Sequence, residues 1–537
     1  MSSRRSPSVA LSARRRRAVL AVIALALMMV VSAVSGLNVA LPVLARDTGA
    51  SQTELQWIVD AYTVVFAGLL LPAGALGDRY GRKGVILSGL VVFGSAAAVA
   101  LFTSDPAVLI GLRAVMGLGA ALVMPVTLSV ITTSFPPEER ASAVAVWVGV
   151  AGGGAVLGLL GSGALLEFFG WSSFFCLNVT LAALAAVGAL LLIPPSRDER
   201  SQPLDGPGAL LSLLAVGGLV FGVIEGPERG WSDPLTDVSF AVGVTSVVGF
   251  VLWELRTPRP MLDPRLFRLR GFGTGSLSVT VQFFASFGFF FIGLQYLQFI
   301  VGYSPLKAAL AMLPLPLVML PLSRRVPGLT SRFGANRVGA TGLLLTAAGL
   351  LTLSGVDVDF RYWQFAAGLA VFAAGMALAS TPATTAIVAS LPPHRQGVAS
   401  AVNDTSRELG SALGIAVLGS ILNDRYRSGV DGALTGLPDA AQEHVRSSVA
   451  FVQTGVADRF GAAGARLVGT AQQAFVDGAS SALRVAAAVV VAAALYVAVR
   501  APRHAGHPET PAGATDSSPA GGHPASTAGT SRPPTAS

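Results

Sequence analysis

Long apolar runs, separated by short polar and charged joins, dominate the whole chain. Most of them are close to the length, about 20 residues, that a helix needs to cross a hydrocarbon core about 30 Å thick. They lack the short apolar–polar alternation of barrel strands, and a helix satisfies its own backbone hydrogen bonds in lipid. We therefore predict an all-α polytopic membrane protein. The fourteen predicted helices occupy approximately residues 18–41, 57–76, 85–102, 108–131, 141–168, 171–193, 208–225, 238–255, 273–301, 306–322, 338–353, 365–391, 397–422 and 479–499.

Two of the polar joins recur along the chain. Part of the join at residues 74–83 returns at 331–334, and the Ser-Phe-Pro-Pro at 134–137 returns as Ser-Leu-Pro-Pro about 255 residues later. Two nearly equal offsets indicate an internal duplication, which is typical of rocker-type transporters with parallel halves around a midplane site.

The duplication divides the chain into five parts. We expect the outer loop at 423–478 to be a variable connector or to contain an amphipathic helix at the surface. The last part is rich in Pro, Gly, Ser, Thr and Ala, which is typical of disorder. The predicted parts are a basic N-terminus (1–17), a six-helix bundle (18–195), two linker helices with flanking loops (196–272), a second six-helix bundle that includes the outer loop (273–500) and a disordered cytoplasmic tail (501–537).

The net charge of +8 is not spread evenly. When the helices are threaded from a cytoplasmic N-terminus, most of the 37 Lys and Arg fall in cytoplasmic segments, including the cluster at 14–17. This bias is the one that sets orientation in a membrane. We expect a multi-pass protein of the plasma membrane with both termini cytoplasmic and its basic end near membrane lipid. Because topology accounts for the charge, we do not expect a nucleic-acid partner.

Sequence motifs for nucleotide or metal chemistry are absent. No glycine-rich loop precedes Lys and Ser/Thr, and the five His have neither HExxH nor zinc spacing. The single Cys176 excludes an internal disulfide framework and a Cys-based metal site. We expect no cofactor, no metal and no enzyme activity, and we expect a monomer.

The join at 74–83 resembles the signature loop between helices two and three of the major facilitator superfamily. Glycines there permit a tight turn, and Asp78 could pair with a basic residue or a helix N-terminus and so hold the cytoplasmic face in one state. The alternative is that the basic residues only fix topology. The residues of this predicted cytoplasmic gate are Gly74, Gly77, Asp78, Arg79, Gly81, Arg82 and Lys83.

Further motifs are similar to those of the fourteen-helix drug and proton antiporters within that superfamily. The resemblance implies a fold of two six-helix bundles plus two linker helices, and the export of organic compounds in exchange for protons. It covers nearly the whole chain except its ends and the outer loop. The motifs that carry it are 38–42 (Asn-Val-Ala-Leu-Pro), 57–62, 112–119, 171–178, 296–298 and 302–306.

Arg113 and Asp60 lie in otherwise apolar helices. A cation at the centre of a membrane helix costs about 2.5 to 3.5 kcal/mol even on insertion scales, so it needs a partner or a wet cavity. In the resembled family the matching arginine takes part in proton exchange, and Asp60 is one candidate partner. The alternative is a permanent ion pair that only holds helices together.

The usual acid of the first helix in this family is replaced by Ala33. Proton coupling must then rely on other membrane acids, namely Asp60, Asp404 and Glu408. Asp404 and Glu408 are four residues apart and therefore share a helix face, with Arg407 beside them. We predict that they bind and release protons, although a cytoplasmic gate of ion pairs is an equal alternative.

The fifth predicted helix is rich in glycine, with GxxxG spacing that lets another helix approach closely. This resembles the antiporter motif, but Leu159 stands where the family usually has proline, so any bend must come from glycine. Generic close packing is the alternative to an export-specific role. The glycines concerned are Gly149, Gly153, Gly154, Gly158 and Gly161.

The ninth predicted helix carries aromatic and amide side chains suited to an amphiphilic organic ligand. Some of these aromatic rings could instead face lipid. The predicted substrate-cavity residues are Gln282, Phe283, Phe287, Gln295, Tyr296 and Gln298.

The sequence therefore predicts an exporter of hydrophobic or cationic drugs or antibiotics that is driven by protons through Asp60, Arg113, Asp404 and Glu408. A facilitator or importer of a small organic nutrient, with or without proton coupling, is an alternative favoured by Ala33 and Leu159. A membrane sensor or scaffold that no longer transports is a second alternative.

Overall fold

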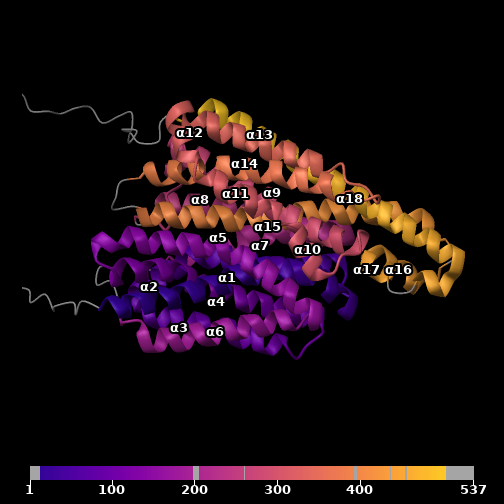
Figure 1. Ribbon diagram of the computed structural model, residues 1–537, viewed down its shortest axis with the longest axis horizontal. Helices are drawn as coiled ribbons and strands as arrows, with labels where there is room; N and C mark the ends of the chain where they lie inside the picture. Colours follow the sequence, from indigo (N-terminus) through magenta and orange to yellow (C-terminus); the bar gives the residue numbers. More distant parts are fainter. Residues whose placement is uncertain are drawn as a thin grey trace, which may run out of the picture.

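The computed structural model describes residues 12–196, 205–258, 260–391, 396–435, 437–453 and 456–502. Figure 1 shows helices lying side by side along the long axis, with the start of α1 (Ala13–Thr48) and the end of α18 (Val456–Arg500) at the same end of the molecule. We call this the terminal end. The opposite end, where α16 (Asp439–Ser447) and α17 (Val449–Gln453) lie, is called the cap end. The described residues contain no strand, and the all-α prediction is confirmed.

The first six long helices begin and end where the local sequence dictates. Ser51 and Glu54 form a capping box, in which Ser51 Oγ accepts the Glu54 N–H at 3.2 Å and Glu54 Oε2 accepts the Ser51 N–H at 2.8 Å. Asp105 caps the fourth helix, and Pro106 fits its first turn. These helices are α1 (Ala13–Thr48), α2 (Gln52–Tyr80), α3 (Arg82–Ala100), α4 (Pro106–Ser134), α5 (Pro137–Phe168) and α6 (Ser173–Leu192).

The rest of the chain contains a helical pair and a second set of helices. Pro305 and Pro314 each begin a short helix, so the predicted segment 306–322 is broken in two. The helical pair is α7 (Gly206–Arg229) and α8 (Pro234–Arg256). The second set is η1 (Pro264–Arg268), α9 (Arg270–Gln295), the π-helix η2 (Tyr296–Ile300), α10 (Pro305–Ala311), α11 (Pro314–Ser323), α12 (Val326–Phe333), α13 (Ala335–Leu353), α14 (Tyr362–Ala389), α15 (Gln396–Val430), η4 (Asp431–Ala433) and α18 (Val456–Arg500).

Helix packing repeats between the two sets. Helix α1 packs on α5 as α9 packs on α15, and α3 packs on α4 and α6 as α13 packs on α14 and α18. The recurring joins also share a backbone feature, because Gly81 before α3 and Gly334 before α13 have φ values of 104° and 89°. A side chain with Cβ rarely adopts this conformation. The internal duplication is therefore visible in both packing and backbone.

The helical pair α7–α8 lies against both sets rather than to one side of them. Helix α7 packs on α2 of the first set and on α15 of the second. Val64, Val220, Ile224, Ala412 and Ala416 form one buried cluster at this three-helix junction. The linker thus contributes to the contact between the halves.

The segment predicted as an outer loop is mostly helical. Helix α15 continues beyond the predicted end at residue 422 to Val430, and α18 begins at Val456 instead of near residue 479. We call these extensions, with η4, α16 and α17, the cap. Its packing explains the helices, since Tyr426, Leu434, Val445 and Phe475 are buried in the same apolar core. Residues 436, 454 and 455 and the predicted disordered tail beyond Pro502 lie outside the described residues.

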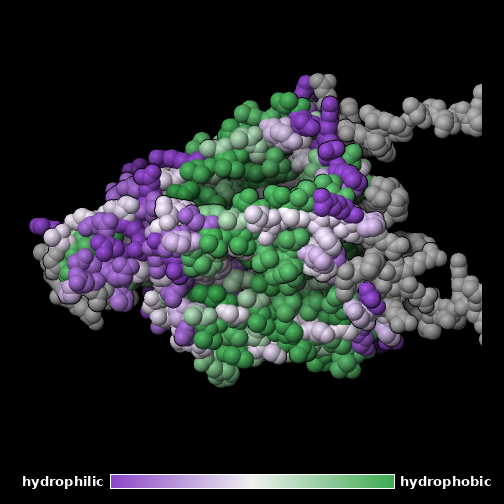
Figure 2. Space-filling model, turned by 180° about the vertical axis from the view of Figure 1, so that it is seen from behind, coloured by the Kyte–Doolittle hydropathy of each residue, from purple (hydrophilic) through white to green (hydrophobic). Residues whose placement is uncertain are grey.

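The surface agrees with a membrane location. Figure 2 shows a broad hydrophobic band between hydrophilic side chains gathered toward the two ends. By length and composition, ten helical spans of the described chain could each cross a membrane. The remaining predicted spans correspond to α2, α5, α13 and α15, which are helical but do not meet that measure over their described residues.

Candidate functional site

At the cap end, η2 joins the two halves. Gln298 is fully buried, and its Nε2 donates to the carbonyl oxygen of Val39 in α1 at 3.0 Å. In return Arg46 Nη2 donates to the Gln298 carbonyl at 2.9 Å, and its guanidinium lies 5.3 Å from the centre of the Phe299 ring. Gln298 was predicted to line the substrate cavity, but in this conformation it closes the contact between the halves.

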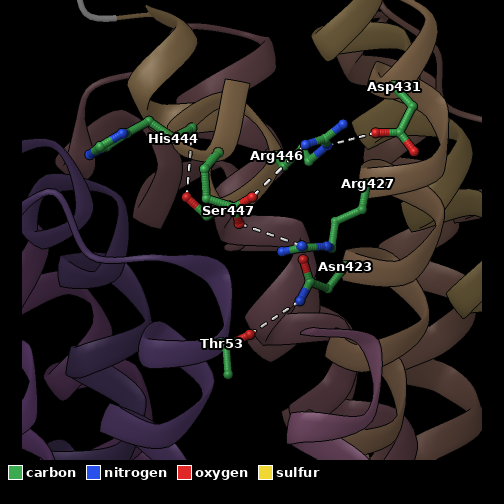
Figure 3. A network of polar contacts seen from close by, with 8 residues as sticks. Thr53, Asn423, Arg427, Asp431, His444, Arg446 and Ser447 are labelled. Atoms are coloured by element: carbon green, nitrogen blue, oxygen red, sulfur yellow. Dashed lines mark hydrogen bonds and ion pairs between the residues drawn. The ribbon is translucent and has the colours of Figure 1, made fainter. Parts of the chain in front are cut away.

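Helices α2 and α15 form a second contact at the same end. Asn423 Nδ2 donates to Thr53 Oγ1 at 3.2 Å, as Figure 3 shows, and both residues are buried. About one helical turn further along α2, the amide of fully buried Gln56 lies 3.5 Å from the carbonyl of Ile415 and directly against Gly419. A third contact joins α5 to α10, where Gly163 packs on Pro305 and Ala309. The halves are therefore closed together at the cap end.

Ion pairs fix α16 to the end of α15. Figure 3 shows Arg446 reaching Asp431 and Arg427 lying nearby. The Arg446 Nε to Asp431 Oδ1 distance is 2.7 Å, and Arg427 Nη2 lies 3.5 Å from Glu443 Oε1. These groups are partly exposed, so the buried bond from Tyr426 Oη to the Val445 carbonyl, at 2.9 Å, gives the firmer attachment.

Arg113 is completely buried inside the first half. Its Nε donates to the Ile58 carbonyl at 2.9 Å, and its guanidinium lies 4.3 Å from the centre of the Tyr62 ring. Both terminal nitrogens, Nη1 and Nη2, have no hydrogen-bond partner. Gly117 allows this arrangement because a Cβ there would clash with the Tyr62 carbonyl.

Asp60 is completely buried, and neither of its carboxyl oxygens has a hydrogen-bond partner. The candidate ion pair with Arg113 is not formed. Ile58 and Tyr62, which hold Arg113, are one turn apart on one face of α2, whereas Asp60 lies two residues from each and so points to the other side. Its neighbours along that face, Gln56 and Val64, contact α15 and α7. Asp60 therefore occupies the junction of α2, α7 and α15.

Asp404 and Glu408 are half-buried on α15 and interact electrostatically. The ion pair with Arg407, which was one of two alternatives, is absent from the described contacts, and the Arg407 guanidinium lies 5.3 Å from the centre of the Phe283 ring of α9. Asp404 instead accepts a hydrogen bond from Asn403 at 3.4 Å. Glu408 also lies within electrostatic reach of Tyr62, the residue whose ring contacts Arg113.

The predicted cavity residues of α9 and η2 divide into two groups. Phe283 and Phe287 are half-buried and stacked, with ring centres 5.8 Å apart. The others are buried in helix contacts: Gln282 Oε1 accepts from Ser380 at 2.7 Å, Tyr296 Oη donates to the Asp357 carbonyl at 2.7 Å, and Gln295 donates to its own helix at Phe291. Only the phenylalanine pair offers an exposed aromatic surface.

The signature join lies at the terminal end. Gly77 packs directly on Val126, and Lys83 Nζ donates to the Leu190 carbonyl of α6 at 2.7 Å. Gly74 packs on Pro125, while Arg79 stacks near Tyr80. The Arg82 N–H donates to the Ser196 carbonyl at 2.9 Å, which fixes the turn. The side chain of Asp78 lies outside the described residues, so its predicted role as a latch stays a prediction.

Two of the predicted packing glycines of α5 lie against α1. Gly158 packs on Ser32 and Ser35, and Gly154 packs on Met28 and Val31. Gly161, in contrast, faces open space, while the surroundings of Gly149 and Gly153 lie outside the described residues.

Several residues at the site were missed in the sequence. Gln56, Thr53 and Asn423 join the halves, and Glu225 of α7 contacts α2. The available signal was polarity: Gln56 lies one helical turn before Asp60 on the same face. In the sequence, Glu225 was interpreted only as the last residue of a predicted membrane helix.

With this geometry in hand, comparison with known proteins gives a consistent result. The family model described as Major Facilitator Superfamily matches residues 23–415. The chain belongs to the major facilitator superfamily. Among solved members of similar fold is a bacterial homologue of the human lysosomal transporter Spinster in an inward-facing and unoccupied conformation, with a TM-score of 0.63 and 18% identity over 91% of this chain and 98% of that one.

Curated relatives of this major facilitator protein are closer in sequence. The multidrug efflux pump LfrA of Mycolicibacterium smegmatis is 34% identical over 92% of this chain and 98% of its own length. The methyl viologen resistance protein SmvA of Salmonella typhimurium is 34% identical over 73% and 80% of the two chains. The tetracenomycin C resistance and export protein of Streptomyces glaucescens is 30% identical over 88% and 89%. The chain is thus a multi-pass membrane protein of a transporter family.

Proposed function

We propose that this protein exports hydrophobic or cationic organic compounds from the cytoplasm in exchange for protons. The printed functions of the relatives support export, because they include multidrug efflux, methyl viologen resistance and antibiotic export. Phe283 and Phe287 stack on α9, and Asp404 and Glu408 lie on α15, which packs on α9; aromatic rings and acids together suit a flat organic cation. The proposal includes a monomer in the plasma membrane.

The terminal end is assigned to the cytoplasm in this proposal. Basic residues gather there, in the first turns of α1 and at the join between α2 and α3, and the positive-inside rule places such residues in the cytoplasm. The cap end is then external. Since the contacts described between the halves gather at the cap end, the conformation faces inward.

The observation that supports proton coupling most directly is that Asp60 is buried without a hydrogen-bond partner. An ionised carboxylate without a partner in an apolar site is costly, so the carboxyl is protonated in this conformation. Loss of the proton would leave a buried charge between α2, α7 and α15. Separation of these helices at the cap end would hydrate that charge. Deprotonation of Asp60 therefore favours the outward-facing state.

The other charged groups modulate this step. Arg113 has two guanidinium nitrogens without a hydrogen-bond partner and contacts Tyr62, which lies within electrostatic reach of Glu408. A cationic substrate bound beside Asp404 and Glu408 would compete electrostatically with proton binding to the same acids. Proton and substrate would then bind in alternation, as exchange requires.

Asp60→Asn tests the proposal directly. In inverted membrane vesicles energised by a pH gradient, uptake of a fluorescent cationic dye should fall to a small fraction of the wild-type rate, because a coupling free energy of about 1–3 kcal/mol corresponds to about 5–150-fold. The control is Asp359→Asn, an exposed acid in the loop before α14. Undiminished gradient-driven transport by Asp60→Asn would contradict the proposal.

The same vesicle assay distinguishes the proposed function from two alternative functions. The buried Ala33, in place of an acid, favours a facilitator or importer that does not use protons through α1. Equal flux with and without a pH gradient would support it. A scaffold without transport would show no flux, and deletion of residues 501–537 would abolish its partner binding.

A further inference from the structure

Three side chains of α2 and α7 form a contact near the cap end, close to Asp60 in the chain of α2. The indole Nε1 of Trp57 donates to Glu225 Oε1 at 2.7 Å, which joins α2 to α7. Arg229 Nε donates to the other oxygen of Glu225 at 2.6 Å. The Trp57 ring also packs on Phe221, with ring centres 5.5 Å apart. Glu225 is thus held between an indole and a guanidinium.

These side chains cover the face of α2 that carries Asp60. Trp57 and Asp60 are three residues apart and therefore lie on one helix face. Val64, one turn further, clusters with Val220 and Ile224 of α7. Helix α7 is also tied to the second half, because Ser420 Oγ of α15 donates to the Val223 carbonyl. The helix that was expected to be a linker is therefore a wall of the Asp60 site.

Exposure falls steadily from the surface toward Asp60. The Arg229 side chain is 46% exposed and that of Glu225 is 12% exposed, whereas Asp60 is 0% exposed. A proton that enters along α7 from the cap end reaches the Trp57–Glu225 bond before it reaches Asp60. When α2 leaves α7, this bond must break.

We propose that the Trp57–Glu225 hydrogen bond is a plug that controls access from the cap-end solution to Asp60, and that α7 is a working part of the transporter. Trp57 and Glu225 are positioning residues, since they act through Asp60. The plug explains how Asp60, an acid without a hydrogen-bond partner, stays buried although it lies only about two turns after the start of α2. Its coupling role rests on the function proposed above, whereas its control of access does not.

The test is the rate at which a hydrophobic carbodiimide modifies Asp60 in the purified full-length protein, measured by mass spectrometry. Trp57→Phe keeps a ring but removes the N–H, and Glu225→Ala removes the acceptor. Both should raise the rate at Asp60 by about 2–10-fold, which is the effect of losing one hydrogen bond. Glu225→Gln retains an acceptor oxygen and should stay near the wild-type rate. Asp60→Asn should give no adduct at this position.

Glu408 provides an internal reference in every sample, because it is half-buried and lies twelve residues before Ser420, the residue of α15 that bonds to α7 at Val223. Its modification rate should not change. Unchanged modification of Asp60 in Trp57→Phe and Glu225→Ala overturns the proposal. So does a parallel rise at Asp60 and Glu408, which indicates general loosening, or a rise in Glu225→Gln as large as in Glu225→Ala.

The result is separable from that of the vesicle experiment. If Asp60→Asn retains gradient-driven transport, the assignment of proton coupling fails. The carbodiimide rates still decide whether Trp57 and Glu225 control access to Asp60. If transport by Asp60→Asn is lost and the rates do not respond, coupling stands and the plug is rejected.

Discussion

At the scale of single residues, Arg113 illustrates how a buried cation is accommodated. One nitrogen satisfies the Ile58 carbonyl, and the flat guanidinium rests on the Tyr62 ring. Lysine has a single rotating ammonium group and cannot make both contacts with the same geometry. The position therefore selects arginine for its shape as well as for its charge.

We expect Arg113→Lys to reduce both stability and transport. Loss of the stacking and of one charge-assisted bond should cost about 1–3 kcal/mol. Thermal unfolding in detergent measures the stability, and the vesicle assay measures transport. Tyr62→Phe is the matched variant, because it keeps the ring below the guanidinium and should be milder. Wild-type stability of Arg113→Lys would show that these contacts do not matter.

How much of this site could be predicted depends on the kind of information that each residue carries. Asp60 and Arg113 stand out as charges in apolar helices, so their burial was foreseeable. Their failure to pair was not, because the direction of Asp60 depends on where α7 and α15 pack. Glu225 lies at the end of an apolar run, where an acid normally marks only the membrane boundary.

At the scale of helices, close approach depends on a few glycines. Gly117 of α4 lies against the backbone of α2 at Tyr62, the residue that supports Arg113. Gly111, also on α4, faces no atom within 4 Å. The same substitution on one helix should therefore have opposite consequences.

Gly117→Ala should destabilise the protein by about 1–3 kcal/mol, because a methyl group there meets a carbonyl oxygen that cannot move aside. Gly111→Ala should be neutral or stabilising by up to about 1 kcal/mol, because alanine is the better helix former. The unfolding temperatures of the two purified variants measure the difference. Equal temperatures would contradict the packing described for α2 and α4.

Helix positions were predictable because hydropathy and length decide them in a bilayer. The outer loop was not, since the extensions of α15 and α18 leave the membrane and depend on mutual packing around Tyr426 and Phe475. Segment 306–322 followed the pattern in extent, but the helix is interrupted before Pro314, where α11 begins.

At the scale of the whole molecule, the proposed exchange requires the two halves to separate at the cap end. The Thr53–Asn423 contact crosses between them, whereas the bond from Ser480 to the Ser354 carbonyl stays within the second half. Because the chain has only Cys176, one substitution gives a cysteine-free background. A reversible covalent link can then be placed at either contact.

We expect oxidation of Thr53→Cys/Asn423→Cys, made in Cys176→Ser, to stop transport and reduction to restore it. The same-half pair Ser354→Cys/Ser480→Cys should transport under both conditions. Dye transport in vesicles, before and after a reducing agent, measures the effect. Full transport by the oxidised Thr53–Asn423 pair would contradict a need for separation at this contact.

Helix α18 has 45 residues and is therefore about 67 Å long, more than twice the hydrocarbon thickness of about 30 Å. It packs on α15 and α17, and it extends beyond the length that a bilayer core requires. In the orientation proposed above, such a rigid projection would offer an epitope to a nanobody added to intact cells. A binder that recognises the braced shape would report the conformation of the protein without entering the cell or occupying the drug pathway.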